Sequence, residues 1–379
     1  MLDVKTYKEK AQLFGQQLEF KTGDFSKRNW GNSWHSLCSY RGKLKPAIAH
    51  ILVRDFSKKG DIVLDPMGGV GTIPLEANLQ SRIGVSNDLS LFASVIASAK
   101  LNPPQIDDVK VGIIKLSKFI EENKNNFINN EEVRTFGLNK KIADYFHPDT
   151  LLEILAARCY FASNHTSSVD VLLMSCMLHI LHGNRPYALS RRSHPLTPLA
   201  PKGEFVYKNV VDHVRNKVLL MYSKKDFWHW NRGQSYNCDI LELPDHLKER
   251  ADIIITSPPF ASSFRFYTQN WMRLWFSGWT ENDFKRADDH YFDNKQNENM
   301  DIYLDYFRVC SEMLKDDGKM ILHLGKSKNV NMAEELTRRC TDYFKVIHLT
   351  EENVEGSESQ GIVDKGATTD HQFLFLQRK

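Results

Sequence analysis

Short strand-like runs alternate with helical stretches near the start of the chain, and this rhythm constrains the fold more than any other feature. The β-branched run "DIVLD" (61–65) is followed by the helical pattern "GTIPLEANLQ" (71–80). A second run, "SRIGVSND" (81–88), is followed by "SLFASVIASAKL" (90–101). Strands joined by helices in this way lie side by side in a parallel sheet. The rhythm therefore predicts an α/β fold with a doubly wound sheet.

A mostly helical segment interrupts this rhythm after Asn102-Pro103-Pro104, and strand-like runs return from residue 235 to the end of the chain. The helical patterns are "VKVGIIKLSKFIEENK", "DTLLEILAARCYFA", "SSVDVLLMSCMLHIL" and "EFVYKNVVDHVRNKVLLMYS". The later strand-like runs are "SYNCDILEL", "ADIIITSPPF", "GKMILHLG", "FKVIHLT" and "HQFLFLQRK". We therefore predict one mostly parallel sheet whose sequence is interrupted by a helical insertion.

A glycine-rich turn follows the first strand in "VLDPMGGVGTIPLEA". Asp65-Pro66 ends the strand, and Gly69 and Gly71 allow the backbone to approach a ligand before a helix begins near Thr72. Glycine-rich turns between strands and helices are common, so this one alone fits a structural turn as well as a nucleotide site.

Polar side chains stand at four predicted strand ends: Asp65, Asp88, Asp239 and Ser257. Ligands of open α/β sheets lie beyond the carboxyl ends of the strands. Asp88 follows the glycine turn by about the 20 residues at which a carboxylate usually meets a ribose hydroxyl. A single aspartate is more often a helix cap or a turn residue, but four polar strand ends in consistent order favour a shared pocket.

The stretch "DIIITSPPFASSF" (252–264) places a hydroxyl group and an aromatic ring on a rigid turn directly after a strand. Proline removes amide donors, so the Ser257 oxygen and a carbonyl of the turn remain available as acceptors. Two such acceptors would hold both N–H groups of an exocyclic amine and direct its lone pair at an electrophilic carbon. Phe260 would offer a face on which a planar base stacks. The structural alternative is a rigid turn that only covers the sheet edge.

Together these motifs resemble those of the amino-methylating DNA methyltransferases, which transfer a methyl group from S-adenosylmethionine to a ring-attached amino nitrogen. "DPMGGVGT" is similar to the family's cofactor loop, although Met67 stands where the family usually has phenylalanine. "TSPPF" resembles the catalytic motif in the form typical of N4-cytosine enzymes. "SYRGKLKPAIAHIL" is similar to the helix that closes over the cofactor's methionine end, and "CDILEL" to the strand end near its adenine. The resemblance covers roughly residues 30–100 and 235–379.

The resemblance implies a Rossmann-like methyltransferase fold with a seven-stranded sheet, and S-adenosylmethionine as the cofactor. It divides the chain into residues 1–102 with the cofactor loop, a mostly helical insertion over 103–233 for target recognition, and residues 234–379 with the catalytic motif. The implied cofactor-binding residues are Tyr40, Pro46, Asp65, Pro66, Met67, Gly69, Gly71, Thr72, Asp88 and Asp239, with Asp88 (or Ser86) on the ribose and Asp239 on the adenine. The implied catalytic residues are Ser257, Pro258, Pro259 and Phe260, with Ser257 and the Pro258 carbonyl accepting the amino protons.

A basic and aromatic stretch lies within the helical insertion. From Arg185 to Arg232, ten Lys or Arg residues stand against three acidic residues, with Trp228, His229 and Trp230 among them. Such a stretch suits contact with phosphates and wedging between base steps, although charge runs are more often solvated surface. A base inside a duplex must also be rotated out of the stack to reach such a pocket. We therefore predict double-stranded DNA as the partner, with Arg185, Arg191, Arg192, Lys202 and Arg232 as contacts.

Composition excludes several other classes of protein. No apolar run reaches the roughly 18 residues that a membrane span requires, and the N-terminus lacks the layout of a secretion signal. The six cysteines include no CxxC pair, which disfavours a disulfide framework or a zinc site and favours a reducing cytoplasm. His179 and His182 share a helical face without a third ligand, so no metal is assigned.

The sequence thus favours a cytoplasmic, sequence-specific DNA methyltransferase that makes N4-methylcytosine. The nearest alternative is N6-adenine methylation, because adenine and cytosine present similar amino edges; an RNA or protein amide substrate fits the basic insertion less well. A dinucleotide-dependent oxidoreductase would use the glycine turn but gives no reason for Ser-Pro-Pro-Phe. Retention of every polar strand end disfavours a catalytically silent DNA-binding module. The recognition sequence, the oligomeric state and the existence of a cognate restriction endonuclease stay open.

Overall fold

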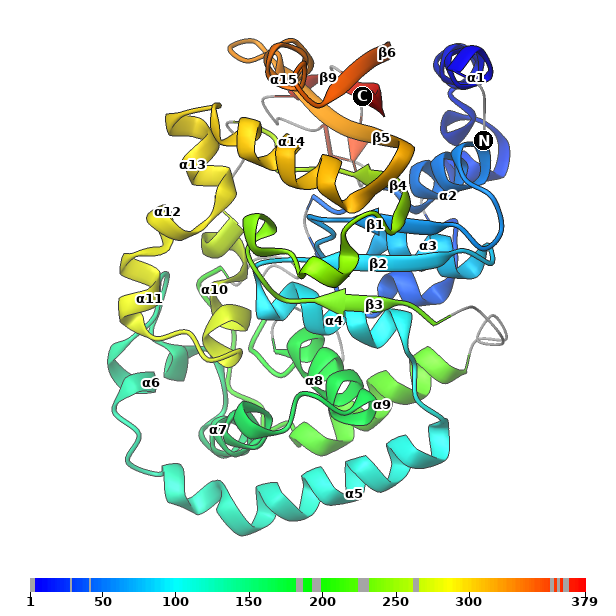
Figure 1. Cartoon of the computed structure of the whole chain (residues 1–379). Helices are drawn as coiled ribbons and strands as arrows, with labels where there is room; N and C mark the ends of the chain where they lie inside the picture. The colour runs from blue at the N-terminus through cyan, green and yellow to red at the C-terminus, as the bar shows by residue number, and fades with distance from the viewer. Residues whose placement is uncertain are drawn as a thin grey trace.

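A seven-stranded sheet forms the centre of the protein in the computed structural model (Figure 1). The structure describes residues 4–27, 29–40, 42–181, 187–192, 199–223, 232–261, 266–354, 358–359, 362–363 and 368–379. The strands are β1 (Ile62–Asp65), β2 (Ile83–Asn87), β3 (Gln234–Tyr236), β4 (Ala251–Thr256), β5 (Leu314–Ser327), β6 (Phe344–Asn353) and β9 (Thr368–Arg378). A separate antiparallel pair is formed by β7 (Glu358–Ser359) and β8 (Ile362–Val363).

The strands of the large sheet run in the order β3-β2-β1-β4-β5-β9-β6. In this order, adjacent strands from β3 to β5 pair in parallel. Strand β9 lies between β5 and β6 and pairs antiparallel with both. This topology is that of the methyltransferase fold and confirms the predicted fold class. β3 is shorter than its strand-like run, because the Asp239 side chain accepts a hydrogen bond from the Leu241 amide at 3.0 Å and starts the short 3-10 helix η7 (Ile240–Glu242).

Apolar side chains project from both faces of the central strands. Val63 and Ile253 pack on one face, and the adjacent residues Leu64 and Ile254 pack on the other. Successive strand residues point to opposite faces, so a strand covered on both sides reads as a continuous apolar run. The first face is covered by α1 (Val4–Gln17), α2 (Pro46–Phe56) and α3 (Thr72–Leu79), and the second by α14 (Ile302–Met313) and α15 (Met332–Arg339).

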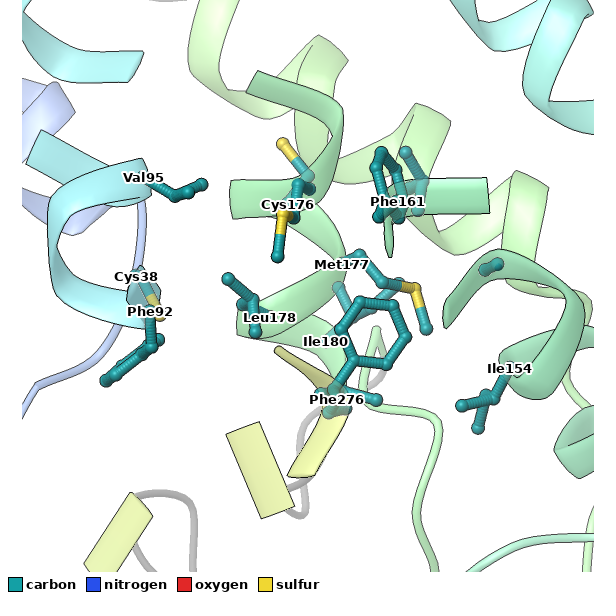
Figure 2. Packing of buried hydrophobic residues seen from close by; sticks show 14 of the residues in the cluster. Cys38, Phe92, Val95, Ile154, Phe161, Cys176, Met177, Leu178, Ile180 and Phe276 are labelled. Carbon is teal, nitrogen blue, oxygen red and sulfur yellow. The ribbon is translucent and has the colours of Figure 1, made fainter. Parts of the chain in front are cut away.

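Helices fill the predicted insertion and pack directly against the sheet region. Its helices are α5 (Ile106–Asn123), α6 (Glu132–Thr135), α7 (Pro148–Ser163), α8 (Ser168–Ile180) and α9 (Val210–Tyr222). Each of the four predicted helical patterns overlaps one of these helices, but α9 begins only at Val210, because the Asn209 side chain caps it there, and residues 204–209 of the last pattern are not helical. Cys176 and Leu178 of α8 share a buried cluster with Phe92 and Val95 of α4 (Leu91–Leu101), which follows β2 (Figure 2). One continuous core therefore joins the insertion to the helices that flank the sheet.

A second group of helices follows the Ser-Pro-Pro-Phe turn along one side of the molecule (Figure 1). They are α10 (Phe266–Phe276), α11 (Glu281–Lys285), α12 (Ala287–His290) and α13 (Phe292–Glu298). Trp271 and Trp275 of α10 are buried in the cluster that contains the insertion, so these two rings belong to the core. Among the described helices, none combines the length and the hydrophobicity that crossing a membrane requires.

Candidate active site

A cavity of about 350 Å³ opens at the carboxyl ends of β1, β2 and β4. The predicted catalytic and cofactor residues that line it are Tyr40, Asp65, Pro66, Met67, Gly69, Thr72, Asp88, Asp239, Ser257, Pro258, Pro259 and Phe260. Asp65 and Ser257, almost 200 residues apart in the chain, thus meet in one place, because each stands at the end of a strand of the same sheet and parallel strands end at the same edge.

Two predicted cofactor residues do not line the cavity. Pro46 is the first residue of α2, where its missing amide donor costs nothing. Gly71 has a positive φ of 71°, and a Cβ atom there would lie 2.9 Å from the Cβ of Ala97. Gly71 therefore permits close packing of α3 against α4 and not contact with a ligand. Tyr40 does line the cavity, but it lies in the loop before α2 and not in that helix.

The glycine turn is held in place by the carboxylate of Asp88. One oxygen of Asp88 accepts a hydrogen bond from the Gly69 amide at 3.0 Å, and the other accepts one from the Ser90 amide at 2.9 Å. Gly69 has a positive φ of 51°, and a Cβ atom there would lie 3.4 Å from the Tyr40 hydroxyl. A side chain at Gly69 would therefore narrow the space between the loop and Tyr40. Ser86 instead faces the back of the loop, against Gly68, so Asp88 is the residue available to a ligand.

Two carboxyl groups in the cavity have raised pKa values. Burial, together with a smaller effect of the nearby Asp88 carboxylate, raises the pKa of Asp65 to about 7. Desolvation also raises the pKa of Asp88 to about 6, although its hydrogen bonds from Ser90 and Gly69 oppose the shift. Neither carboxylate forms a salt bridge with a described residue. Two carboxylates without a cation make the cavity suited to a positively charged ligand.

The Ser-Pro-Pro-Phe turn is fixed at two points by side chains from other elements. The Ser257 hydroxyl oxygen lies 3.0 Å from Nδ1 of His323 on β5. The Pro259 carbonyl accepts a hydrogen bond from Nε2 of Gln296 on α13 at 3.0 Å, and Gln296 is almost fully buried. These contacts connect the turn to β5 and α13, so the oxygen atoms of Ser257 and Pro259 are held in a defined orientation.

The remaining groups of this turn are positioned for a ligand. The Phe260 ring packs against Gly325, where an added Cβ atom would lie 2.3 Å from the ring, so only glycine leaves room for this ring position. None of the described residues donates a hydrogen bond to the carbonyl of Pro258, and Pro258 is one of the residues that line the cavity. Both residues of the predicted acceptor pair, Ser257 and Pro258, therefore belong to the cavity wall.

Sequence reasoning missed His323, Gln296 and the part of the wall formed by Tyr291 and Asp293. One signal for His323 was available, because it is the one polar residue in the apolar run "MILHLG". In the parallel register Thr256 pairs with Leu322, which places Ser257 and His323 next to each other. The sequence carries no comparable signal for Gln296, Tyr291 or Asp293, which lie in a polar segment without strand or helix periodicity.

Comparison with known proteins gives one sequence match. The model of the family UPF0020, an RMKL-like methyltransferase domain, matches residues 34–139, which is less than half of the chain but includes the glycine turn and Asp88. Among curated proteins, none matches the sequence.

Several solved structures resemble the fold at low identity. A TehB-like S-adenosylmethionine-dependent methyltransferase from Corynebacterium glutamicum is 7% identical, with 99% of this chain and 98% of that chain covered, at a TM-score of 0.32. TYW2 from P. horikoshii, in complex with MeSAdo, is 8% identical over 90% of this chain and 64% of that chain, at a TM-score of 0.33. The rRNA methyltransferase aviRa from Streptomyces viridochromogenes is 9% identical, with 90% of this chain and 88% of that chain covered, at a TM-score of 0.33. At these values the similarities do not identify a substrate.

The sheet topology, the cavity at its carboxyl edge and the family match agree on the class of protein. The chain is an S-adenosylmethionine-dependent methyltransferase. The residues of the cavity fit this cofactor, because the Gly69 loop leaves space that a side chain would occupy and Asp88 and Asp239 stand at neighbouring strand ends. The unpaired carboxylates also suit the positive charges of S-adenosylmethionine.

The raised pKa values predict that cofactor binding to this methyltransferase releases protons. Asp65 and Asp88 are ionised only above about pH 7 and pH 6, and a cationic ligand favours their ionised forms. We expect affinity for S-adenosylmethionine to rise between pH 5 and pH 7.5, with about one proton released per site near pH 6.5. Calorimetry at pH 6.5 in buffers of different ionisation enthalpy measures this release. Heats that do not depend on the buffer would contradict the prediction, and Asp88→Asn should release fewer protons than the wild type.

The predicted DNA-contact residues of this methyltransferase have different surroundings. Arg185 lies outside the described residues. The guanidinium of Arg191 donates hydrogen bonds to the carbonyls of Asp144 and Gly203, both at 3.1 Å, and lies 3.9 Å from the centre of the Phe205 ring. Each of the three guanidinium nitrogens of Arg191 thus donates to a backbone carbonyl of the protein, which leaves few donors for a phosphate.

The other three predicted DNA contacts, Arg192, Lys202 and Arg232, are exposed but lie in two separate parts of the structure. The Lys202 amide donates a hydrogen bond to the Arg192 carbonyl at 2.9 Å, so these residues are neighbours, and neither side chain forms an ion pair with a described residue. Arg232 precedes β3 and lies at the amino edge of the sheet, whereas the cavity lies at the carboxyl edge. Arg232 therefore lies away from the cavity, and its contact with DNA stays a prediction.

Proposed function

We propose that this methyltransferase acts on double-stranded DNA at a specific sequence and methylates the N4 amino group of a flipped-out cytosine. One observation carries the proposal: the Ser257–Phe260 turn lines the same cavity as the Gly69 loop. The cofactor and an amine held by the turn can therefore meet. A turn that served only to cover the sheet edge would not need to line the cavity beside the Gly69 loop.

The residues of the turn would orient the amino group of the target base. The Ser257 oxygen and the Pro258 carbonyl would each accept one N–H, which draws the nitrogen lone pair out of conjugation with the ring. Phe260 would stack on the base. When bound, S-adenosylmethionine supplies a methyl group that its sulfonium has already activated. The protein therefore contributes mainly position and electrostatic stabilisation, and Ser257 is not required to act as a strong base.

Contacts at the end of α8 support a nucleic acid as the substrate. The Ser39 amide donates to Nδ1 of His179 at 3.3 Å, which places the end of α8 next to the loop that carries the cavity residue Tyr40. The chain then leads to the exposed Arg192, and Lys202 pairs with it. Neither cation has an acidic partner among the residues that the structure describes, and this pair would hold the phosphates that flank a flipped base.

The double variant Arg192→Ala/Lys202→Ala tests this surface. We expect weaker DNA binding for every sequence, and a salt dependence (log Kd against log salt concentration) whose slope is smaller by about 1.8, since each phosphate contact contributes about 0.9. Affinity for S-adenosylmethionine should not change. Fluorescence anisotropy at several salt concentrations gives the slope. The control is Arg232→Ala, at the opposite edge of the sheet; an equal loss in the control and the double variant would argue against the proposed surface.

The nature of the substrate is tested by the product. The protein is incubated with deuterium-labelled S-adenosylmethionine and with either genomic DNA or total RNA, and the digested nucleosides are analysed by mass spectrometry. Labelled N4-methyldeoxycytidine is the expected product. Labelled N6-methyldeoxyadenosine would instead assign the same geometry to adenine, and label in RNA alone would reject a DNA substrate. Modification-sensitive sequencing of DNA from cells that express the protein then gives the recognition sequence, which a cognate restriction endonuclease would share.

A further inference from the structure

The Ser257 hydroxyl carries one proton, and the role of Ser257 depends on where that proton points. A serine oxygen can donate one hydrogen bond and accept two. An oxygen that must accept an N–H from an amino group does so best when its own proton is engaged elsewhere. The partner that the structure places at this hydroxyl is Nδ1 of His323, at 3.0 Å.

We propose that His323 is a positioning residue that accepts the Ser257 proton and thereby presents the lone pairs of the Ser257 oxygen to the substrate amine. This inference rests on the proposed function of the same site. His323 lies on β5, next to the strand that ends at Ser257, so the parallel register holds the two residues together independently of any ligand. The contact is therefore built into the sheet.

The surroundings of His323 keep the imidazole neutral. Its side chain is only 5% exposed, and the rings of Phe260, His371 and Phe373 surround it at centroid distances of 5.4, 4.9 and 5.0 Å. Burial lowers the pKa of His323 well below its usual value, and His371 lowers it further. A neutral imidazole has one nitrogen that donates and one that accepts, whereas an imidazolium would only donate.

The environment of the second ring nitrogen selects the tautomer. Nε2 of His323 is buried and has no hydrogen-bond partner among the described residues. An N–H that points at surrounding aromatic rings gains from their electron-rich faces, while a lone pair in the same position is repelled by them. The proton therefore belongs on Nε2, which leaves Nδ1 as the acceptor for the Ser257 hydroxyl.

Two substitutions separate this role from packing. His323→Leu fills the same space but offers no acceptor, and we expect turnover to fall by about 100-fold. His323→Asn places a side-chain oxygen near the position of Nδ1 and should keep turnover within about 10-fold of the wild type. KM and Kd for S-adenosylmethionine should stay unchanged in both variants. Equal losses in both variants, or wild-type turnover in His323→Leu, would overturn the proposal.

A second measurement does not depend on methyl transfer. Long-range proton–nitrogen NMR of the folded protein, with His323 assigned by comparison with His323→Asn, reports which ring nitrogen carries the proton. We expect a protonated Nε2 and an unprotonated Nδ1; a proton on Nδ1 would refute the assigned direction of the hydrogen bond. If the wild type methylates no amino nitrogen, the proposed function fails, but this NMR result still decides the state of the Ser257–His323 pair.

Discussion

Ser257→Ala is expected to lower turnover by about 100- to 1000-fold, the effect of removing one oriented group from a preorganised site. Ser257 would provide one of the two acceptors for the target amine, and without it the amine is free to rotate and its lone pair stays conjugated with the ring. The Kd for S-adenosylmethionine should not change, because Asp88 and the Gly69 loop are untouched. Single-turnover methylation of DNA measures the chemical step directly.

Ser235→Ala is a matched control for this substitution. Ser235 lies on β3 of the same sheet that Ser257 follows, but its hydroxyl donates to the carbonyl of Ser94 at 3.1 Å and Ser235 does not line the cavity. The control should methylate at the wild-type rate. Unchanged rates in Ser257→Ala as well would remove Ser257 from the proposed mechanism.

Asp88→Ala is expected to raise the Kd for S-adenosylmethionine by about 30- to 3000-fold, the usual range for truncating a hydrogen-bonded charge that a ligand covers. The loss has two sources. The carboxylate would no longer meet the ribose hydroxyls, and the amides of Gly69 and Ser90 would lose the acceptor that shapes the glycine turn. Calorimetric titration with S-adenosylmethionine measures the change.

Two variants sharpen this test. Asp88→Asn keeps an oxygen for one of the two amides, so its Kd for S-adenosylmethionine should lie between that of Asp88→Ala and that of the wild type. Asp61→Ala is the control, because Asp61 also accepts a hydrogen bond from a backbone amide, that of Lys58 at 2.7 Å, but lies at the amino end of β1. If Asp61→Ala weakens cofactor binding as much as Asp88→Ala, the effect reflects general destabilisation and not the cavity.

Residues that follow strands were the most predictable part of this site. Asp65, Asp88, Asp239 and Ser257 each end a strand or come shortly after one, and strand direction alone brings such residues to one edge of a parallel sheet. The same rule applied to Arg232 would have placed it at the amino edge, away from the cavity. Arg232 is predicted as a DNA contact from its charge alone, and charge does not indicate where a residue lies in the fold.

Other parts of the site depend on contacts that no local pattern encodes. Gly71 matches the cofactor-loop motif, yet its neighbour is Ala97 of α4, which only helix packing determines. The position of Gln296 at the Pro259 carbonyl depends on how α13 folds back over the turn. Arg191 belongs to a basic stretch, but nearby carbonyls and the Phe205 ring use its guanidinium. Each case needed the tertiary structure, because a residue's type does not reveal its partners.

A crystal structure of the protein with S-adenosylhomocysteine tests the central claim most directly. The predicted result is a ligand in the cavity, with its ribose hydroxyls on Asp88, its adenine toward Asp239 and its sulfur directed at the space in front of Ser257 and Phe260. A ligand bound at another place, or a sulfur turned away from the Ser257 turn, would contradict the account, because the methyl donor and the amine could not then meet.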